Sequence, residues 1–313
     1  MRIFENTNYD FIRWRWYALI LSGLIIAGGA LFAYTRGGIP LGIDFTGGTL
    51  VVVKFDQPVT EDAVRQALDA VPGEKVVQSY GAPADNQMLI RLPIIAGTEE
   101  GTSLEQGARA VVSSLQGAKL PKSEVLQQEI VGPVIGRELQ LKGIYATLAS
   151  IAGIAAYIAI RFRPAFAIGA IVATLHDVLV TLVFLALFGY DLSLNIVAAL
   201  LTITGYSVND TIVIFDRVRE NMRSSRRESL EKVVNTAVNQ TLSRTIITAG
   251  TTFLSVLALY VFGGEVLRGF AFTMLVGIIS GTYSTVFIAA AIAIILGNKQ
   301  GAGASAAVGS AAP

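Results

Sequence analysis

The chain has 313 residues, of which 53% are hydrophobic and only 15% are charged, and its formal net charge is +1. Soluble domains carry about 25% charged residues. The composition therefore indicates an integral membrane protein, and the small net charge argues against a nucleic-acid partner. The chain contains no cysteine and one histidine, which excludes disulfides, thiol chemistry and metal sites rich in cysteine or histidine.

Hydrophobic runs divide the chain into membrane spans. A run of about 20 apolar residues is needed to cross a bilayer, and the first run lacks a cleavage pattern, so we expect it to be retained. Lys and Arg gather in the short segments on one side of the spans, which marks that side, with both termini, as cytoplasmic. Six runs qualify, at 16–35, 143–160, 165–188, 192–215, 241–262 and 268–296.

A polar stretch between the first two spans predicts an extracytoplasmic domain, 37–142. Its patterns predict a strand at 49–55, a helix at 60–71 and two strands around a turn at 81–86, and then a helix from Ser103 and a strand at 123–131. This β-α-β-β-α-β order predicts a small α+β, ferredoxin-like domain.

The remaining segments are assigned from their composition and charge. We expect 1–36 to hold the cytoplasmic N-terminus and first span, and 143–297 to hold the other five spans with a cytoplasmic loop at 217–240. Part of that loop, 226–240, has an apolar face and basic flanks typical of an interfacial helix on membrane lipids. Residues 298–313 are rich in Gly, Ala and Ser and predict a disordered cytoplasmic tail.

A glycine-rich stretch, "GIDFTGG", follows the first span at 42–48. It lacks the downstream Lys-Ser/Thr pair of a phosphate-binding loop. Its residues therefore predict a turn that leads into the first strand of the outer domain.

Polar residues form a stripe along the fourth span. This stripe includes a carboxylate, which is costly in the hydrocarbon core of a membrane. Tyr206, Asn209 and Asp210 lie on one helical face, and Arg244 and Thr248 begin a matching stripe in the fifth span. Asp210 and Arg244 each lie 18 residues from the outer end of their span, about 27 Å at 1.5 Å per residue. If the two helices pack side by side, carboxylate and guanidinium can meet.

The free-energy cost of placing charged groups in a membrane span favours a functional interpretation of Asp210 and Arg244. An Asp or Arg at a helix centre costs about 2.5–3.5 kcal/mol on insertion scales. Two other interpretations stay open: Arg244 snorkels to cytosolic headgroups, or Asp210 is a structural hydrogen-bonding group.

Two further features lie in the third and sixth spans. His176 and Asp177 lie near the bilayer midplane, where the pair is either a proton relay or an interhelical hydrogen-bonding pair. Gly269, Thr273, Gly277 and Gly281 recur every four residues in the sixth span, which predicts a face for close helix packing.

Three motifs together resemble the SecF family, the smaller subunit of the bacterial SecD–SecF preprotein translocation complex, which is related to proton-driven RND transporters. They are "GIDFTGG" after the first span, "GYSVNDTIVIFDRVRE" at the end of the fourth and "LSRTIITAGTT" at the start of the fifth. The resemblance covers about 1–297.

The resemblance implies a non-enzymatic, cofactor-free subunit of the bacterial inner membrane. It would pair with SecD, associate with the SecYEG channel and use the proton motive force to move preproteins outward. Within the family pattern, Asp210 and Arg244 match residues of proton coupling. We expect Tyr206, Asn209, Thr248, His176 and Asp177 to support them. The family's signature loop corresponds to Gly42, Asp44, Gly47 and Gly48.

Two other functions remain open. An RND-like exporter of small molecules or lipids would need a lined pocket in the outer domain, whereas this domain is expected to be small and packed. A passive scaffold that only holds partner subunits would tolerate apolar replacement of Asp210 and Arg244.

Overall fold

The computed structural model describes residues 7–71, 75–81, 83–92, 100–224 and 227–298. The chain divides into two compact units. The helical unit comprises Met1–Ile39, Thr147–Tyr190 and Asn195–Pro313, and the sheet unit comprises Pro40–Ala146 and Asp191–Leu194. The predicted tail, 298–313, falls outside the described residues apart from its first residue.

Six helices in the described part of the chain are long and apolar enough to cross a membrane, as predicted. The chain is therefore a multi-pass membrane protein. A short 3-10 helix, Ile12–Trp14, precedes the first, and the last continues into a π-helical turn, Thr285–Ala289. The helices are α1 (Arg15–Thr35), α5 (Pro133–Arg161), α6 (Pro164–Phe188), α7 (Leu194–Ser224), α8 (Leu230–Phe262) and α9 (Glu265–Ser284).

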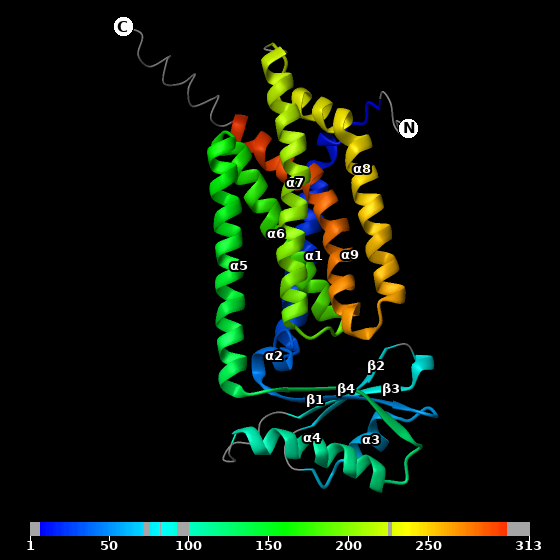
Figure 1. Ribbon diagram of the computed structural model, residues 1–313. Coiled ribbons are helices and arrows are strands. Elements are labelled where there is room, and N and C mark those ends of the chain that lie inside the picture. Colours follow the sequence, from blue (N-terminus) through cyan, green and yellow to red (C-terminus); the bar gives the residue numbers. More distant parts are fainter. Residues whose placement is uncertain (1–6, 72–74, 82, 93–99, 225–226, 299–313) are drawn as a thin grey trace. The chain divides into compact units, whose positions relative to one another are not determined.

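Several helices are longer than the apolar runs that predict them (Figure 1). α5 begins ten residues before the predicted span, at Pro133, because proline suits the first helical position and the polar residues after it are also good helix formers. α7 continues to Ser224 and α8 begins at Leu230. The segment 217–240 is therefore mostly helical, which differs from the loop expected there.

The helix expected at 226–240 begins at Leu230, as the first part of α8. The side chain of Ser229 caps its start by accepting a hydrogen bond from Lys232 N. α8 then bends before it runs along the bundle (Figure 1). No Gly or Pro interrupts 230–249, so the helix continues through the bend.

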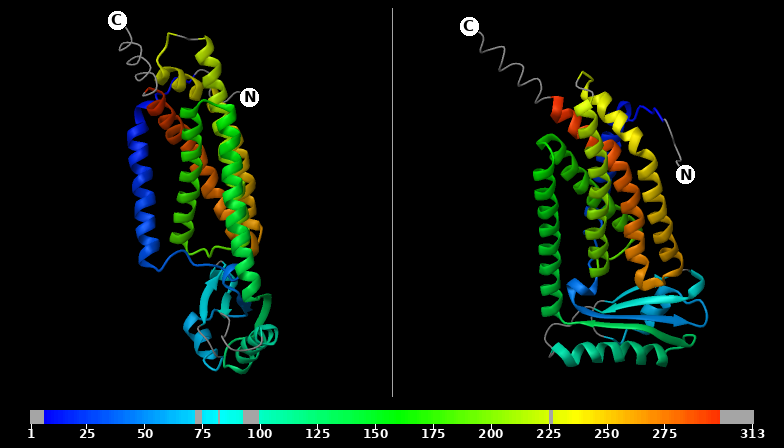
Figure 2. Two further views of the ribbon diagram at one scale, coloured as in Figure 1. Left: turned by 90° about the vertical axis from the view of Figure 1, so that its left-hand side faces the viewer. Right: turned by 45° about the horizontal axis from the view of Figure 1, so that its top comes forward.

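α6 and α9 lie in the middle of the helical unit, with α1 packed against α6 (Figure 2). The predicted small-residue face of α9 packs against α7, as expected: a Cβ on Gly277 would lie 2.2 Å from the Ile203 side chain, and one on Gly281 would lie 3.1 Å from Ser207 Cβ. Glycine at these positions lets the two backbones approach closely.

The sheet unit contains a four-stranded antiparallel sheet in the order β2-β3-β1-β4. Its elements follow the expected β-α-β-β-α-β order along the chain. They are β1 (Gly48–Phe55), α3 (Glu61–Ala67), β2 (Val76–Tyr80), β3 (Gln87–Leu92), α4 (Glu100–Gly117) and β4 (Ser123–Val131), with a short 3-10 helix, Pro83–Asp85, between β2 and β3.

Two helices cover one face of this sheet. Side chains in a strand point to opposite faces at a period of two, so Val51, Val53 and Phe55 share one face, and all three are buried. α3 and α4 both cover this face (Figure 1). They contribute a buried stripe that includes Val64 and Val111.

Candidate functional site

The glycine-rich loop of the sheet unit contains a short helix, α2 (Ile43–Thr46), rather than only a turn. Gly47 and Gly48 follow it with backbone φ angles of 70° and 128°, which residues other than glycine rarely adopt. Gly42 N donates to Leu192 O at 2.7 Å, and Asp44 Oδ2 accepts from Leu194 N at 2.8 Å. Asp44 therefore satisfies one of the free N–H groups at the start of α7.

A second contact fastens the same segment. Arg91 on β3 forms an ion pair with Asp191 and donates to Leu41 O at 3.3 Å. Both charged side chains are largely buried, with 13% and 19% of their surface exposed. Burial lowers the pKa of Arg91 from its ordinary value, but a guanidinium remains charged at neutral pH. The residues before α7 are thus held by the signature loop and by β3.

In the helical unit, Asp210 on α7 accepts a hydrogen bond at 3.0 Å from the hydroxyl of Thr245 on α8. The two helices therefore lie side by side at the level expected from the sequence. Arg244 is exposed and close enough to attract Asp210 electrostatically. Within the described residues, however, Asp210 and Arg244 do not form an ion pair, which would need a nitrogen–oxygen distance of 4.0 Å or less.

The other residues of the predicted stripe lie along the same seam. Tyr206 is half-buried and lies beside Thr252 of α8. Asn209 and Thr248 are exposed on the surface of the chain. Because an exposed amide or hydroxyl within a span is costly in hydrocarbon, this face must meet protein or water.

His176 and Asp177 lie apart from this seam, inside the bundle. Asp177 is fully buried, and its two oxygens accept hydrogen bonds from three serine hydroxyls: Ser207 on α7 at 2.6 Å, and Ser280 and Ser284 on α9 at 2.7 Å each. His176 Nδ1 lies 3.1 Å from Asp177 Oδ1. This carboxylate joins three helices through its hydrogen bonds.

Several hydrogen-bond partners of these groups were not predicted from the sequence. Thr245 is adjacent to Arg244 and lies three residues before Thr248, so helical spacing already placed it on the stripe. Ser22 interrupts an otherwise apolar run in the first span, and its hydroxyl lies 2.9 Å from His176 Nε2. Isolated polar residues in apolar spans are the signal that could have found them.

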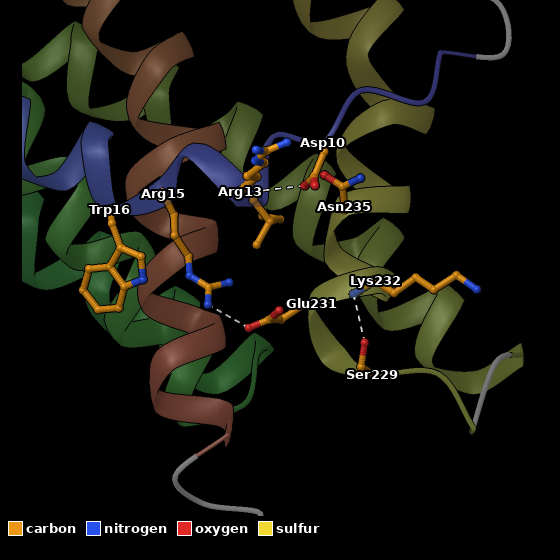
Figure 3. A pocket seen from close by; sticks show the side chains of 9 residues that line it. Asp10, Arg13, Arg15, Trp16, Ser229, Glu231, Lys232 and Asn235 are labelled. Carbon is orange, nitrogen blue, oxygen red and sulfur yellow. Dashed lines mark hydrogen bonds and ion pairs between the residues drawn. The ribbon is translucent and has the colours of Figure 1, made fainter.

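A hollow beside the start of α1 is a second candidate site. Figure 3 shows Arg15 directed toward Glu231 of α8, and their side chains form an ion pair at 2.8 Å. Next to it, Asn239 Oδ1 of α8 accepts a hydrogen bond from Tyr9 N, and Asn235 Oδ1 accepts one from Phe11 N, both at 2.9 Å. These contacts connect the N-terminal segment to α8 beside the hollow.

Two family models match the chain. The model described as "Protein export membrane protein SecD/SecF, C-terminal" matches residues 111–299, and the "SecD/SecF GG Motif" model matches residues 37–59. The first covers more than half of the chain. It contains the whole seam between α7 and α8, while the second contains the signature loop.

Related proteins are similar in sequence to this chain over nearly its full length. Proteins named "Protein translocase subunit SecF" are 43% identical in Rhodothermus marinus, with 96% of this chain and 97% of that protein covered, and 38% identical in Escherichia coli O157:H7, with 93% and 89% covered.

The fold of this chain is also similar to that of a solved structure. The crystal structure of SecDF from Thermus thermophilus, described as a translocon-associated membrane protein, matches with a TM-score of 0.82 and 33% identity over 94% of this chain. This chain spans 39% of that longer one. The chain belongs to the SecF family of protein translocase subunits.

Proposed function

We propose that this chain pairs with a SecD subunit beside the SecYEG channel and uses the proton motive force to move preproteins outward. The observation that carries this proposal is the seam between α7 and α8. There, a half-buried carboxylate inside a membrane span accepts a hydrogen bond from the neighbouring helix. An ionisable group at such a depth marks a proton or ion pathway by default.

Asp210 is the proton acceptor and Arg244 the charge that responds to it. Protonation of Asp210 cancels its attraction for Arg244 and frees α7 and α8 to repack. Each proton that crosses the membrane supplies about 2.3 kcal/mol per 100 mV, so several protons are needed for each length of substrate. Repacking of the spans would then swing the sheet unit, which binds the emerging preprotein.

The orientation follows from charge. Arg and Lys at the ends of α5, α7 and α8 on one side of the bundle support an inner-membrane protein with both termini in the cytoplasm. The sheet unit then lies on the extracytoplasmic side, where a preprotein leaves the channel.

A secretion assay in cells that depend on this chain tests the proposal. Asp210→Asn preserves the shape of the side chain but cannot ionise, and we expect it to lower proton-dependent export at least tenfold. Asp216→Asn is the matched control, since Asp216 pairs with Arg161 on an exposed surface where such pairs contribute little. Normal export by a folded Asp210→Asn protein would instead favour a passive scaffold.

A further inference from the structure

The polar network around His176 is separate from the seam at Asp210 and contains the only histidine of the sequence. It is deeply buried: His176 is 7% exposed, Ser22 on α1 is 4% exposed and Asp177 is 0% exposed. Three hydrogen bonds lead away from the imidazole. They join His176 Nε2 to Ser22 Oγ at 2.9 Å, Ser22 Oγ to Tyr283 Oη at 3.2 Å, and Tyr283 Oη to Ala18 O at 2.8 Å.

The direction of these hydrogen bonds follows from the last acceptor, Ala18 O. A carbonyl oxygen only accepts, so the single hydroxyl proton of Tyr283 goes to Ala18 O. Tyr283 Oη must then accept a hydrogen bond from Ser22. This bond uses the single hydroxyl proton of Ser22. Ser22 has no proton left for the imidazole, and His176 Nε2 must therefore be the donor.

The other ring nitrogen is fixed by Asp177. Three serine hydroxyls donate to that carboxylate at 2.6–2.7 Å, a set of short bonds that an ionised carboxylate attracts. His176 Nδ1 lies 3.1 Å from Oδ1 and must donate, because two acceptors at that distance would repel each other. Both ring nitrogens are therefore donors, which is the state of a protonated imidazole.

We propose that His176 and Asp177 form a second proton-binding site, in which one resident proton makes an imidazolium–carboxylate pair. The titratable groups that face the imidazole are Asp177 on α6 and Tyr283 on α9, within the described part of the chain. α1 contributes the hydroxyl of Ser22. The proton thus links α1, α6 and α9, and its loss would reverse or break the chain of bonds that holds them together.

Because the chain has one histidine, its protonation can be observed directly by NMR of protein labelled with 15N-histidine in bilayers. In a sample at pH 8 we expect a proton on both ring nitrogens of His176, as the hydrogen bonds at Nδ1 and Nε2 require. A neutral imidazole with one bare nitrogen, of either tautomer, would overturn the proposal.

Tyr283→Phe tests how the proton is held. Without the tyrosine hydroxyl, Ser22 can donate to Nε2, and we expect the imidazole to become neutral at pH 8, with its proton on Nδ1. Tyr157→Phe, at a side chain that is 54% exposed, is the matched control and should keep both protons. A doubly protonated imidazole in Tyr283→Phe would contradict the chain of donors.

This signature does not depend on the function proposed for Asp210. Asp210→Asn should leave the spectrum of His176 unchanged even where export is lost. A change in that spectrum would contradict a separate second site.

Discussion

Asp210 and Asp177 are both carboxylates of the helical unit, but their oxygens are satisfied differently. Asp177 receives three serine hydroxyls, whereas Asp210 receives the hydroxyl of Thr245. An ionised carboxylate has about four acceptor sites, so Asp210 retains free acceptor capacity. It can take up a proton without losing a set of bonds, which suits a group that loads and unloads.

Thr245→Val tests the bond to Asp210. The change keeps the shape of the side chain but removes the donor, and hydrogen bonds within membranes average only about 0.6 kcal/mol, so the protein should still fold. We expect proton-dependent export to fall several-fold, because the carboxylate loses the contact that places it on the seam. Thr282→Val is the control, since that hydroxyl donates to Ile278 O of its own helix. Equal export by the two variants would remove Thr245 from the mechanism.

At this scale, the ionisable groups could be predicted from the sequence, but their hydrogen-bond partners could not. Asp210 and Asp177 stood out because a carboxylate in an apolar run is costly. The hydrogen bond from Thr245 rather than an ion pair with Arg244 depends on the rotation of α8 about its axis. The periodicity of a single helix does not determine that rotation to within one residue.

Close helix contacts determine how α6 packs against the end of the last span. A Cβ on Gly169 of α6 would lie 2.6 Å from Ala289 O, and Ala289 belongs to the π-helical turn. Gly169→Ala forces backbone apart, and overpacking of this kind costs about 1–3 kcal/mol. We expect a lower melting temperature in detergent. Gly153→Ala on α5 has nothing within 4 Å of its Cβ and should melt like the unmodified protein. Equal melting of both variants would mean that α6 and the π-helical turn pack less closely than this distance implies.

The ion pair of Arg91 and Asp191 holds the segment that precedes α7. Arg91→Met leaves a largely buried carboxylate without its partner, which costs about 1–3 kcal/mol. We therefore expect faster amide hydrogen exchange at Leu192 and Leu194. Arg65→Met removes an exposed pair with Asp62, worth about 0–1 kcal/mol, and should leave that exchange unchanged. Unchanged exchange in Arg91→Met would show that the signature loop holds the segment alone.

Elements were predicted best where local pattern decides. The strands predicted at 49–55 and 123–131 lie within one residue of β1 and β4, because Gly and Pro residues bound both segments in the sequence. Helix ends were predicted less well. α5 and α7 extend beyond their apolar runs into polar sequence, where good helix formers continue the helix and hydropathy gives no signal.

At the scale of the whole molecule, the exposed polar seam must meet protein or water. Asn209, Arg244 and Thr248 are exposed on this chain, and polar groups in a membrane are costly unless protein or water satisfies them. The partner proposed here, a SecD subunit, would cover them.

Cysteine cross-linking tests that arrangement, and it is unambiguous because the chain has no cysteine of its own. We expect Thr251→Cys, on the exposed face of α8, to form a disulfide with a cysteine in a central span of SecD. Leu148→Cys on α5, 58% exposed among apolar neighbours, should not cross-link. Capture by Leu148→Cys alone would place the partner on the other face.

The central claim is that protons pass through Asp210, and proton flux into proteoliposomes measures it most directly. Vesicles that hold this chain with SecD and SecYEG should take up protons when a preprotein is supplied under a membrane potential. Asp210→Asn should abolish that flux, while Asp216→Asn should retain it. Undiminished flux through a folded Asp210→Asn complex would contradict the account.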